Sequence, residues 1–246
     1  MRHLRVLAFD TSTDDTVVAA AEDGLPVFER VVAPDGRRPL HSRALLALVD
    51  EAVESLGGWD RVDRIAVGVG PGTFTGIRIG VATAAGLGAS AGVDAVGVPT
   101  LTALAMSAAE AAGSHGPTLP LIDARRGEVF GCLHDGARRP AGEPFVCGPA
   151  ALVERLESTG ESGEPPLIGG PGAVRFRDEL IHAGFDVEPP ASPVHRLTGR
   201  PFCDLGAAAE TIGPETLEPL YLRIPDAQLW LERDGKADRG DAAPER

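Results

Sequence analysis

The stretch GVGPGTFTGIRIGVATAAGLG, Gly68–Gly88, links the end of one apolar run to a second apolar segment through a Gly-Pro-Gly turn. Gly-rich turns between a strand and a helix often bind phosphate, because the first amides of the helix are unpaired and its dipole is positive there. This stretch lacks the lysine of a Walker loop, and the only lysine of the chain is Lys236. Its glycines also do not follow the G-x-G-x-x-G spacing of a dinucleotide-binding turn. Phosphate binding is therefore the weaker of two interpretations.

The second interpretation concerns the helix that is predicted after the turn. Four small residues, spaced four apart, share one face of this helix. They are Gly76, Gly80, Ala84 and Gly88. A glycine in a helix interior costs about 0.5–1 kcal/mol relative to alanine. We therefore expect this face to pack closely against another element, which can belong to a partner or to the same chain.

The segments around this stretch predict a mixed sheet. Three apolar runs joined by tight turns indicate an antiparallel meander over residues 4–9, 16–23 and 25–33. Apolar periodicity then predicts a helix over 41–56, and strands over 64–70 and 94–99 enclose the helix described above. This order is typical of an α/β layer in which helices flank a mixed sheet.

The second half of the chain repeats this theme in a reduced form. A hairpin is expected across Arg125-Arg126-Gly127, followed by a helix and by the strand-and-turn segment PPLIGGPGAVRF. The recurrence indicates a duplicated fold with two lobes, over residues 1–100 and 101–227. Residues 228–246 are charged and poor in aromatic side chains, so we expect a disordered tail.

Composition restricts the classes of function. The formal net charge of −13 disfavours direct binding of tRNA, and no apolar run is long enough to span a membrane. The three widely spaced cysteines and the absence of a signal sequence favour the cytoplasm. The six histidines form no H-x-x-x-H pair, so we expect no metal site.

The segment FDTST offers a candidate nucleotide site at the end of the first strand. Polar residues after a buried strand face the phosphates in actin-like and sugar-kinase ATPases, and the Gly-Pro-Gly turn can contribute amides. The candidate nucleotide-facing residues are Asp10, Thr11, Ser12, Gly70, Gly72 and Thr73. The plainer alternative is a turn that these side chains cap. A small-molecule kinase or autonomous ATPase is the runner-up function on this basis. Asp123, Arg125, Arg126 and Glu128 are interpreted as a solvated hairpin tip.

Taken in order, several motifs resemble the bacterial TsaB (YeaZ) family over nearly the whole chain, up to about Ala227. They are LAFDTSTDDTVVAAAEDG, HSRAL, GVGPGTFTGIRIGVATAAGLG, GVPTLTALA, LIDARRGEVF and EPLYLRIPDA. The resemblance implies the two-lobed actin-like ATPase fold, a duplicated ribonuclease H-like fold. It also implies a non-catalytic subunit that pairs with TsaD and TsaE in threonylcarbamoylation of the adenosine next to the tRNA anticodon.

The resemblance can be followed to single positions. The catalytic paralogue TsaD carries two metal-binding histidines in G-V-N-H-L-E-G-H, and the matching segment here is GVPTLTAL, residues 97–104. Thr100 and Leu104 stand at the two histidine positions. Neither side chain replaces an imidazole as a metal ligand, so we expect no catalytic residues and no transferase activity from this chain alone.

The resemblance also implies an interface on two N-terminal helices, which pack against the equivalent helices of the partner or of a second copy of the chain; the sequence leaves open whether the isolated chain is a homodimer or a monomer. The expected interface residues are His41, Leu45, Leu48 and Ala52 on the first helix, with Gly76, Gly80, Ala84 and Gly88 on the second. On this expectation, Gly80→Leu disrupts pairing and leaves the monomer folded. No cofactor of its own is implied, and ATP or ADP is expected only at the interface of the complex.

Overall fold

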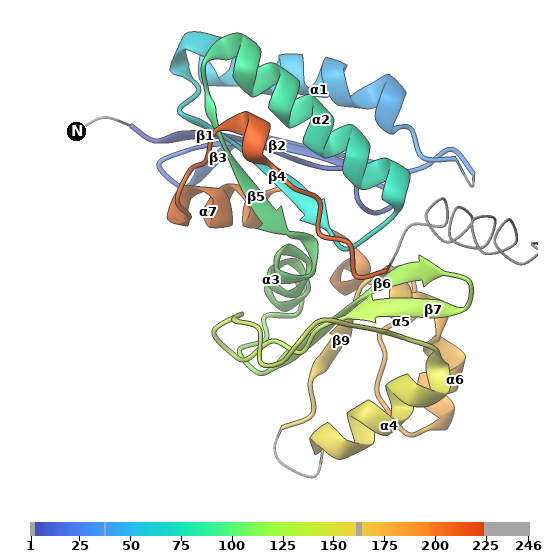
Figure 1. Ribbon diagram of the computed structural model, residues 1–246. Helices are drawn as coiled ribbons and strands as arrows, with labels where there is room; N and C mark the ends of the chain where they lie inside the picture. Colours follow the sequence, from blue (N-terminus) through green and yellow to red (C-terminus); the bar gives the residue numbers. More distant parts are fainter. Residues whose placement is uncertain (1–2, 37, 161–163, 224–246) are drawn as a thin grey trace, which may run out of the picture.

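The computed structural model describes residues 3–36, 38–160 and 164–223, and these form two lobes (Figure 1). The predicted tail at 228–246, and residues 224–227 of the predicted second lobe, lie outside the described residues. Within the described ranges, no helix has the length and apolar character needed to cross a membrane.

The first lobe contains a five-stranded sheet in the order β3-β2-β1-β4-β5. Its strands are β1 (Arg5–Asp10), β2 (Thr16–Glu22), β3 (Leu25–Val32), β4 (Arg64–Gly70) and β5 (Asp94–Pro99). β2 pairs antiparallel with both β1 and β3, whereas β4 pairs parallel with β1 and β5. β2 therefore runs against the other four strands, which is the ribonuclease H-like arrangement.

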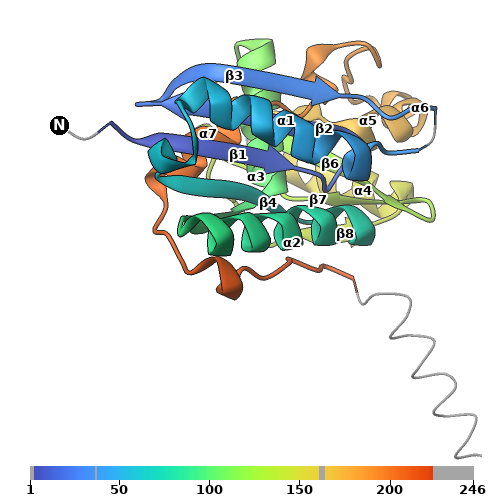
Figure 2. The ribbon, with the colours of Figure 1, turned by 90° about the horizontal axis from the view of Figure 1, so that it is seen from above.

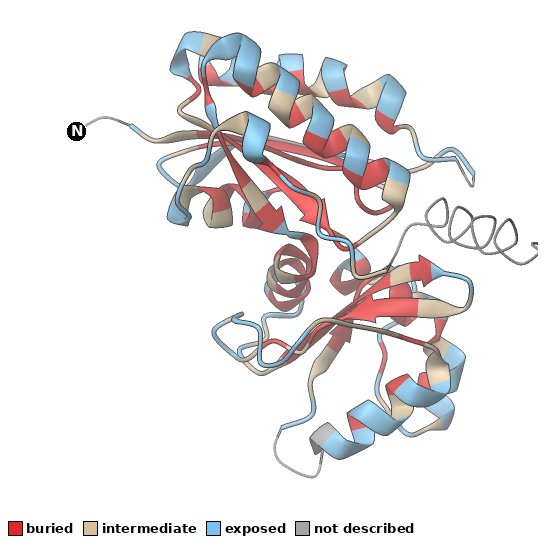
Figure 3. Ribbon diagram, viewed as in Figure 1, coloured by how far each residue is buried: buried red, intermediate tan, exposed pale blue. Residues whose placement is uncertain are grey.

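Helices cover both faces of this sheet. α1 (His41–Leu56) and α2 (Phe74–Ala91) lie side by side on one face (Figure 2). α7 (Arg200–Ala208) packs on the opposite face, and α3 (Thr100–Ala112) runs from the end of β5 toward the second lobe (Figure 1). Burial on both faces explains why β1 and β4 read as continuous apolar runs (Figure 3).

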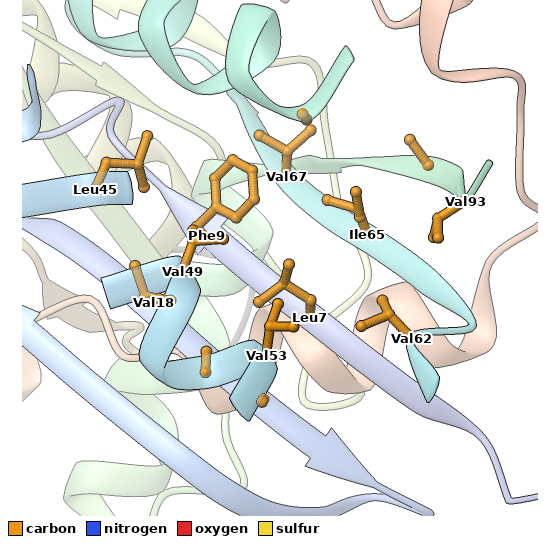
Figure 4. Packing of buried hydrophobic residues seen from close by; sticks show 14 of the residues in the cluster. Leu7, Phe9, Val18, Leu45, Val49, Val53, Val62, Ile65, Val67 and Val93 are labelled. Atoms are coloured by element: carbon orange, nitrogen blue, oxygen red, sulfur yellow. The ribbon is translucent and has the colours of Figure 1, made fainter. Parts of the chain in front are cut away.

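The core of the first lobe follows from two periodicities. Every fourth residue of α1, including Leu45, Val49 and Val53, points down onto the sheet (Figure 4). Alternate residues of β1 meet them, so that Leu7 and Phe9 join this cluster. Their neighbours Val6 and Ala8 point the other way into the cluster that includes Phe202 of α7.

The second lobe repeats four of the five strands in the order β8-β7-β6-β9. Its strands are β6 (Thr118–Arg125), β7 (Glu128–Gly131), β8 (Phe145–Cys147) and β9 (Leu167–Gly169). Again the second strand runs antiparallel to its neighbours and the fourth pairs parallel with the first. The helices are α4 (Pro149–Gly160), α5 (Pro171–Arg175) and α6 (Arg177–His182).

The repeat extends to the turns. Gly70-Pro71-Gly72 leads from β4 toward α2, and Gly170-Pro171-Gly172 stands at the corresponding place after β9, where it forms the start of α5. The predicted fold class is confirmed: mixed sheets flanked by helices, in the duplicated actin-like arrangement.

The predicted division into lobes at residue 100 agrees with the order of the strands, but part of the predicted second lobe packs against the first. After the second lobe, the chain returns through η2 (Pro193–His195) to α7, which contacts the first sheet. It then passes η3 (Pro214–Thr216), beside α2 and β5. Residues 200–217 thus pack with the N-terminal lobe, a long-range return that the local sequence pattern does not reveal.

Candidate functional site

The carboxyl ends of β1 and β4 meet at a closed cluster of polar side chains. The backbone amide and the hydroxyl of Ser12 each donate a hydrogen bond of 2.9 Å to Asp10 Oδ1. Thr100 Oγ1 donates to Asp10 Oδ2 at 3.0 Å and accepts from the amide of Gly70 at 3.2 Å. The side chains of Asp10, Ser12 and Thr100 are fully buried.

Burial and hydrogen bonding act in opposite directions on the Asp10 carboxyl. Burial raises the pKa of Asp10 above its ordinary value, because desolvation penalises the charged form, and the hydrogen bonds from Ser12 and Thr100 oppose this effect. Room for the carboxyl exists only because Gly68 has no side chain: a Cβ there would lie 1.7 Å from Asp10 Oδ2.

The candidate nucleotide-facing residues divide into two groups. Asp10, Thr11 and Ser12 are fully buried and Gly70 is buried, so their placement differs from the expectation that they face a nucleotide. The plainer alternative, a turn capped by its own side chains, describes what Asp10 and Ser12 do. Gly72 and Thr73 are half-buried and line a cleft.

This cleft has a volume of about 380 Å³ and lies where the Gly-Pro-Gly turn faces the second lobe. We call it the interlobe cleft. Its walls come from the start of α2, the β6–β7 turn and the last described segment of the chain. The lining residues are Pro71, Gly72, Thr73, Phe74, Thr75, Asp123, Ala124, Arg125, Arg126, Phe130, Leu220, Tyr221, Leu222 and Arg223.

Charged contacts join the lobes around the cleft. Arg125 bonds Asp14 of the first lobe at 2.5 Å and Asp123 of its own lobe at 3.2 Å. Arg223 pairs with Glu128 and donates to the carbonyl of Ala124 at 3.1 Å. The sequence interpretation of Arg125 as part of a solvated tip missed this role. In the sequence, the one signal for this role was the pair of arginines at the expected turn. The structure places both of them at positive φ.

The small face of α2 packs inside the chain. A Cβ on Gly76 would lie 1.9 Å from the carbonyl oxygen of Thr11, and one on Gly80 would lie 2.7 Å from Thr11 Oγ1. A Cβ on Gly88 would meet Val93 and Pro214, and Ala84 is fully buried. Of the two neighbours that the spacing allowed, the structure therefore shows the intramolecular one. This placement differs from the predicted partner-facing role of Gly76, Gly80, Ala84 and Gly88.

The predicted interface residues of α1 also point inward. Leu45 and Ala52 are core residues, and Leu48 is partly buried against the same cluster. His41 is buried, and its Nδ1 lies 2.8 Å from Thr16 Oγ1. The apolar periodicity that predicted this helix is thus the periodicity of the core, and the residues that the resemblance assigned to an interface belong to it.

Other residues form the outer surface of α1 and α2 (Figures 2 and 3). Leu46 is 62% exposed. On α2, Thr75, Ala82 and Gly86 are exposed, and a Cβ on Gly86 would meet no atom within 4 Å. We call this surface, carried by Leu46, Thr75, Ala82 and Gly86, the outer helix face.

At the two positions that match the metal-binding histidines of TsaD, the side chains serve the interior packing of this chain. Thr100 belongs to the Asp10 cluster, and Leu104 is a fully buried core residue. Across the described ranges, no group of three or more His, Cys, Asp or Glu side chains is arranged to hold a metal ion.

Comparison with known proteins adds the family. The chain is 30% identical to the tRNA threonylcarbamoyladenosine biosynthesis protein TsaB of Escherichia coli, over 95% of this chain and the full length of that protein. It is 32% identical to the protein of the same name from Haemophilus influenzae, over 96% of this chain and again the full length of that protein. The chain belongs to the TsaB family.

Two further comparisons agree. A family model described as TsaD, tRNA N6-adenosine threonylcarbamoyltransferase, matches residues 30–160. Among solved structures, YeaZ from Pseudomonas aeruginosa has a TM-score of 0.68 at 26% identity, covering 89% of this chain and all of that chain. A second P. aeruginosa structure, described as similar to peptidase YeaZ, has a TM-score of 0.73 at 27% identity, with the same coverage.

Proposed function

We propose that the protein is a non-catalytic subunit that assembles with a TsaD-type transferase and with TsaE in tRNA threonylcarbamoyladenosine biosynthesis. The role in this biosynthesis is supported by membership of the TsaB family. The non-catalytic role is supported chiefly by the Asp10 cluster. Thr100 stands at the first position where TsaD has a metal-binding histidine. Here it donates a hydrogen bond to the buried Asp10 and is itself fully buried.

The outer helix face is the proposed contact with TsaD. Gly86 lies in a helix interior, where glycine costs about 0.5–1 kcal/mol relative to alanine. Unlike Gly76 and Gly80, it has no close contact among the described residues that requires the missing side chain. A closely approaching partner helix supplies such a reason. The exposed Leu46 adds an apolar side chain to this face, and depletion of charge together with apolar contact is typical of an interface core.

A matched pair of variants tests this assignment. Ala82→Glu places a charge on the outer helix face, and Ala151→Glu places the same charge on the exposed surface of α4 in the second lobe. We expect Ala82→Glu to abolish co-elution with the cognate TsaD and stimulation of its transferase activity, and Ala151→Glu to retain both. Equal binding by the two variants would contradict the proposed interface.

The proposal also covers nucleotide and localisation. ATP or ADP binds at the interface of the assembled subunits, and the complex acts in the cytoplasm without direct contact between this chain and tRNA. Calorimetry with ATP separates this from the runner-up kinase: we expect heat of binding only after TsaD and TsaE are added. Turnover of ATP by the isolated chain would favour the kinase. Equilibrium sedimentation of the isolated chain tests whether the same face forms a homodimer.

A further inference from the structure

An exposed arginine of α2 is held in place by two aromatic side chains. The guanidinium of Arg78 lies 3.8 Å from the centre of the ring of Phe74, one turn earlier in the same helix. Its Nε donates a hydrogen bond of 3.0 Å to the hydroxyl of Tyr221. The rings of Phe74 and Tyr221 lie 5.2 Å apart. We call these three side chains the Arg78 cluster.

Tyr221 reaches this cluster from a distant part of the sequence. After η3, the last described segment runs beside α2 (Figure 2). The amide of Leu220 donates a hydrogen bond of 2.7 Å to the carbonyl of Val69 in β4, which anchors the residue next to Tyr221. The guanidinium of Arg78 is therefore oriented from two directions, by a ring against its face and by a hydroxyl at its Nε.

The remaining N–H donors of this guanidinium have no partner within residues 3–36, 38–160 and 164–223. The hydrogen bond to Tyr221 uses only Nε, so the groups on Nη1 and Nη2 are left, and Arg78 forms no ion pair with a carboxylate of these ranges. The arginines of the interlobe cleft differ in this respect, because Arg125 and Arg223 are paired with carboxylates of the chain.

The place of this charge in the helix is unfavourable for the isolated chain. Arg78 is the fifth residue of α2, and helical side chains lean back toward the N-terminus. The helix dipole is positive at that end and disfavours cations there. The first turn of α2 contains no acidic residue that would offset the charge. A carboxylate from outside the chain would do so.

The chemistry of the Arg78 cluster suits a carboxylate side chain. A guanidinium is planar, and its parallel N–H groups match the two oxygens of a carboxylate. Because Arg78 is already stacked and hydrogen-bonded, less side-chain freedom is lost when a ligand binds. Arginine and tyrosine are also among the residues that contribute most to the affinity of protein interfaces.

The cluster lies on the same ridge of α2 as the outer helix face, because Arg78, Ala82 and Gly86 follow one another at intervals of four residues. We propose that the Arg78 cluster receives a carboxylate side chain of the TsaD-type partner when that subunit docks on the outer helix face. The pair fixes the position of the partner along α2. This inference rests on the proposed function and adds the chemistry by which the partner is recognised.

Two substitutions separate the geometry of the cluster from its charge. Arg78→Lys keeps the charge and removes the planar guanidinium, and we expect it to weaken binding of the cognate TsaD about tenfold. Tyr221→Phe keeps the ring and removes the hydroxyl, and it should weaken binding in the same direction. Arg30→Lys is the matched control, because Arg30 is also exposed and lies 5.2 Å from the centre of the Phe28 ring, on the edge strand β3. Equal affinity of Arg78→Lys and Arg30→Lys, measured by calorimetry, would overturn the proposal.

A double-mutant cycle identifies the carboxylate. Exposed Asp and Glu residues of TsaD are changed singly to Asn or Gln, and each variant is measured against the natural chain and against Arg78→Lys. We expect one of them to lose affinity for the natural chain and to lose much less for Arg78→Lys, because the contact is already gone. Additive losses at every position would contradict the proposal. So would an effect of Arg78→Lys on self-association alone, because it would assign the guanidinium to a second copy.

The orientation of Arg78 can be measured without the partner. In NMR spectra of the isolated chain, we expect the Hε proton of Arg78 to exchange with water several-fold more slowly than in Tyr221→Phe. Equal exchange would show that the guanidinium is not held, and would overturn the inference whether or not TsaD binds. If the natural chain failed to bind TsaD, the proposed function would fall as well. If it bound TsaD and Arg78→Lys bound equally, only this inference would fall.

Discussion

Thr100 Oγ1 donates a hydrogen bond of 3.0 Å to Asp10 Oδ2, which joins the first residue of α3 to the last residue of β1. The bond ties the start of the helix between the lobes to the centre of the first sheet. Both side chains are fully buried, so the bond is part of the closed cluster around the Asp10 carboxyl.

This enclosure predicts how stability depends on pH. The pKa of Asp10 is raised from 3.8 in the folded state, so the folded chain holds its proton to higher pH than the unfolded chain does. Stability should therefore fall as pH rises through the interval above about 3.8. Asp10→Asn keeps the shape and removes this titration. Its stability relative to the natural chain, measured by urea unfolding, should rise across the same interval.

An exposed site provides the control for this measurement. Asp60→Asn makes the same substitution at an exposed position of η1 (Trp59–Arg61). If Asp10→Asn and Asp60→Asn gave the same pH profile, the result would contradict a raised pKa of Asp10 in the folded chain.

Replacing glycine with alanine should have opposite effects on stability at two positions of α2. Gly76→Ala forces a Cβ to within 1.9 Å of the carbonyl oxygen of Thr11, and overpacking of this kind costs about 1–3 kcal/mol. Gly86→Ala meets open space and should stabilise the chain by about 0.5–1 kcal/mol. Thermal unfolding of both variants measures the difference. Equal stability would show that the small face is not packed as described.

The same contacts revise the expectation for Gly80→Leu. A Cβ on Gly80 alone would lie 2.7 Å from Thr11 Oγ1, and the rest of a leucine side chain has no space between α2 and β4. We expect this variant to unfold or to aggregate rather than to remain a folded monomer. A soluble monomer with native circular dichroism would contradict the inward orientation of the face.

The sequence pattern predicted most elements of the fold because each lies in a local period. The four-residue repeat of Leu45, Val49 and Val53 locates α1, and the small stripe locates α2. The same repeats could not distinguish a core face from a partner face, because both require close packing. The ion pair between Asp14 and Arg125 was also invisible, because its partners are separated by more than a hundred residues and meet only when the two lobes are placed.

Two buried histidines predict a loss of stability in acid. Burial lowers the pKa of His41 and of His134 from 6.5, and the ring of His134 lies between the carbonyl of Cys132 at 2.9 Å and Thr102 Oγ1 at 3.1 Å. The unfolded chain binds protons first, so the stabilising effect is complete above about pH 6.5 and is lost as pH falls below it. Ring-proton NMR should show both residues titrating below the usual range. Ordinary titration of His134 would contradict the packing around it.

Cys203 predicts a thiol that does not react in the folded state. It lies in α7 against the first sheet, where burial raises its pKa to about 12. Because the thiolate is the nucleophile, the folded chain should resist alkylation of Cys203 by iodoacetamide at mildly alkaline pH, whereas the urea-unfolded chain should be modified fully. Peptide mass spectrometry measures the modification at this residue. Rapid alkylation of Cys203 in the native protein would show that α7 separates readily from the first lobe. That result would contradict the packing of α7 on the first sheet.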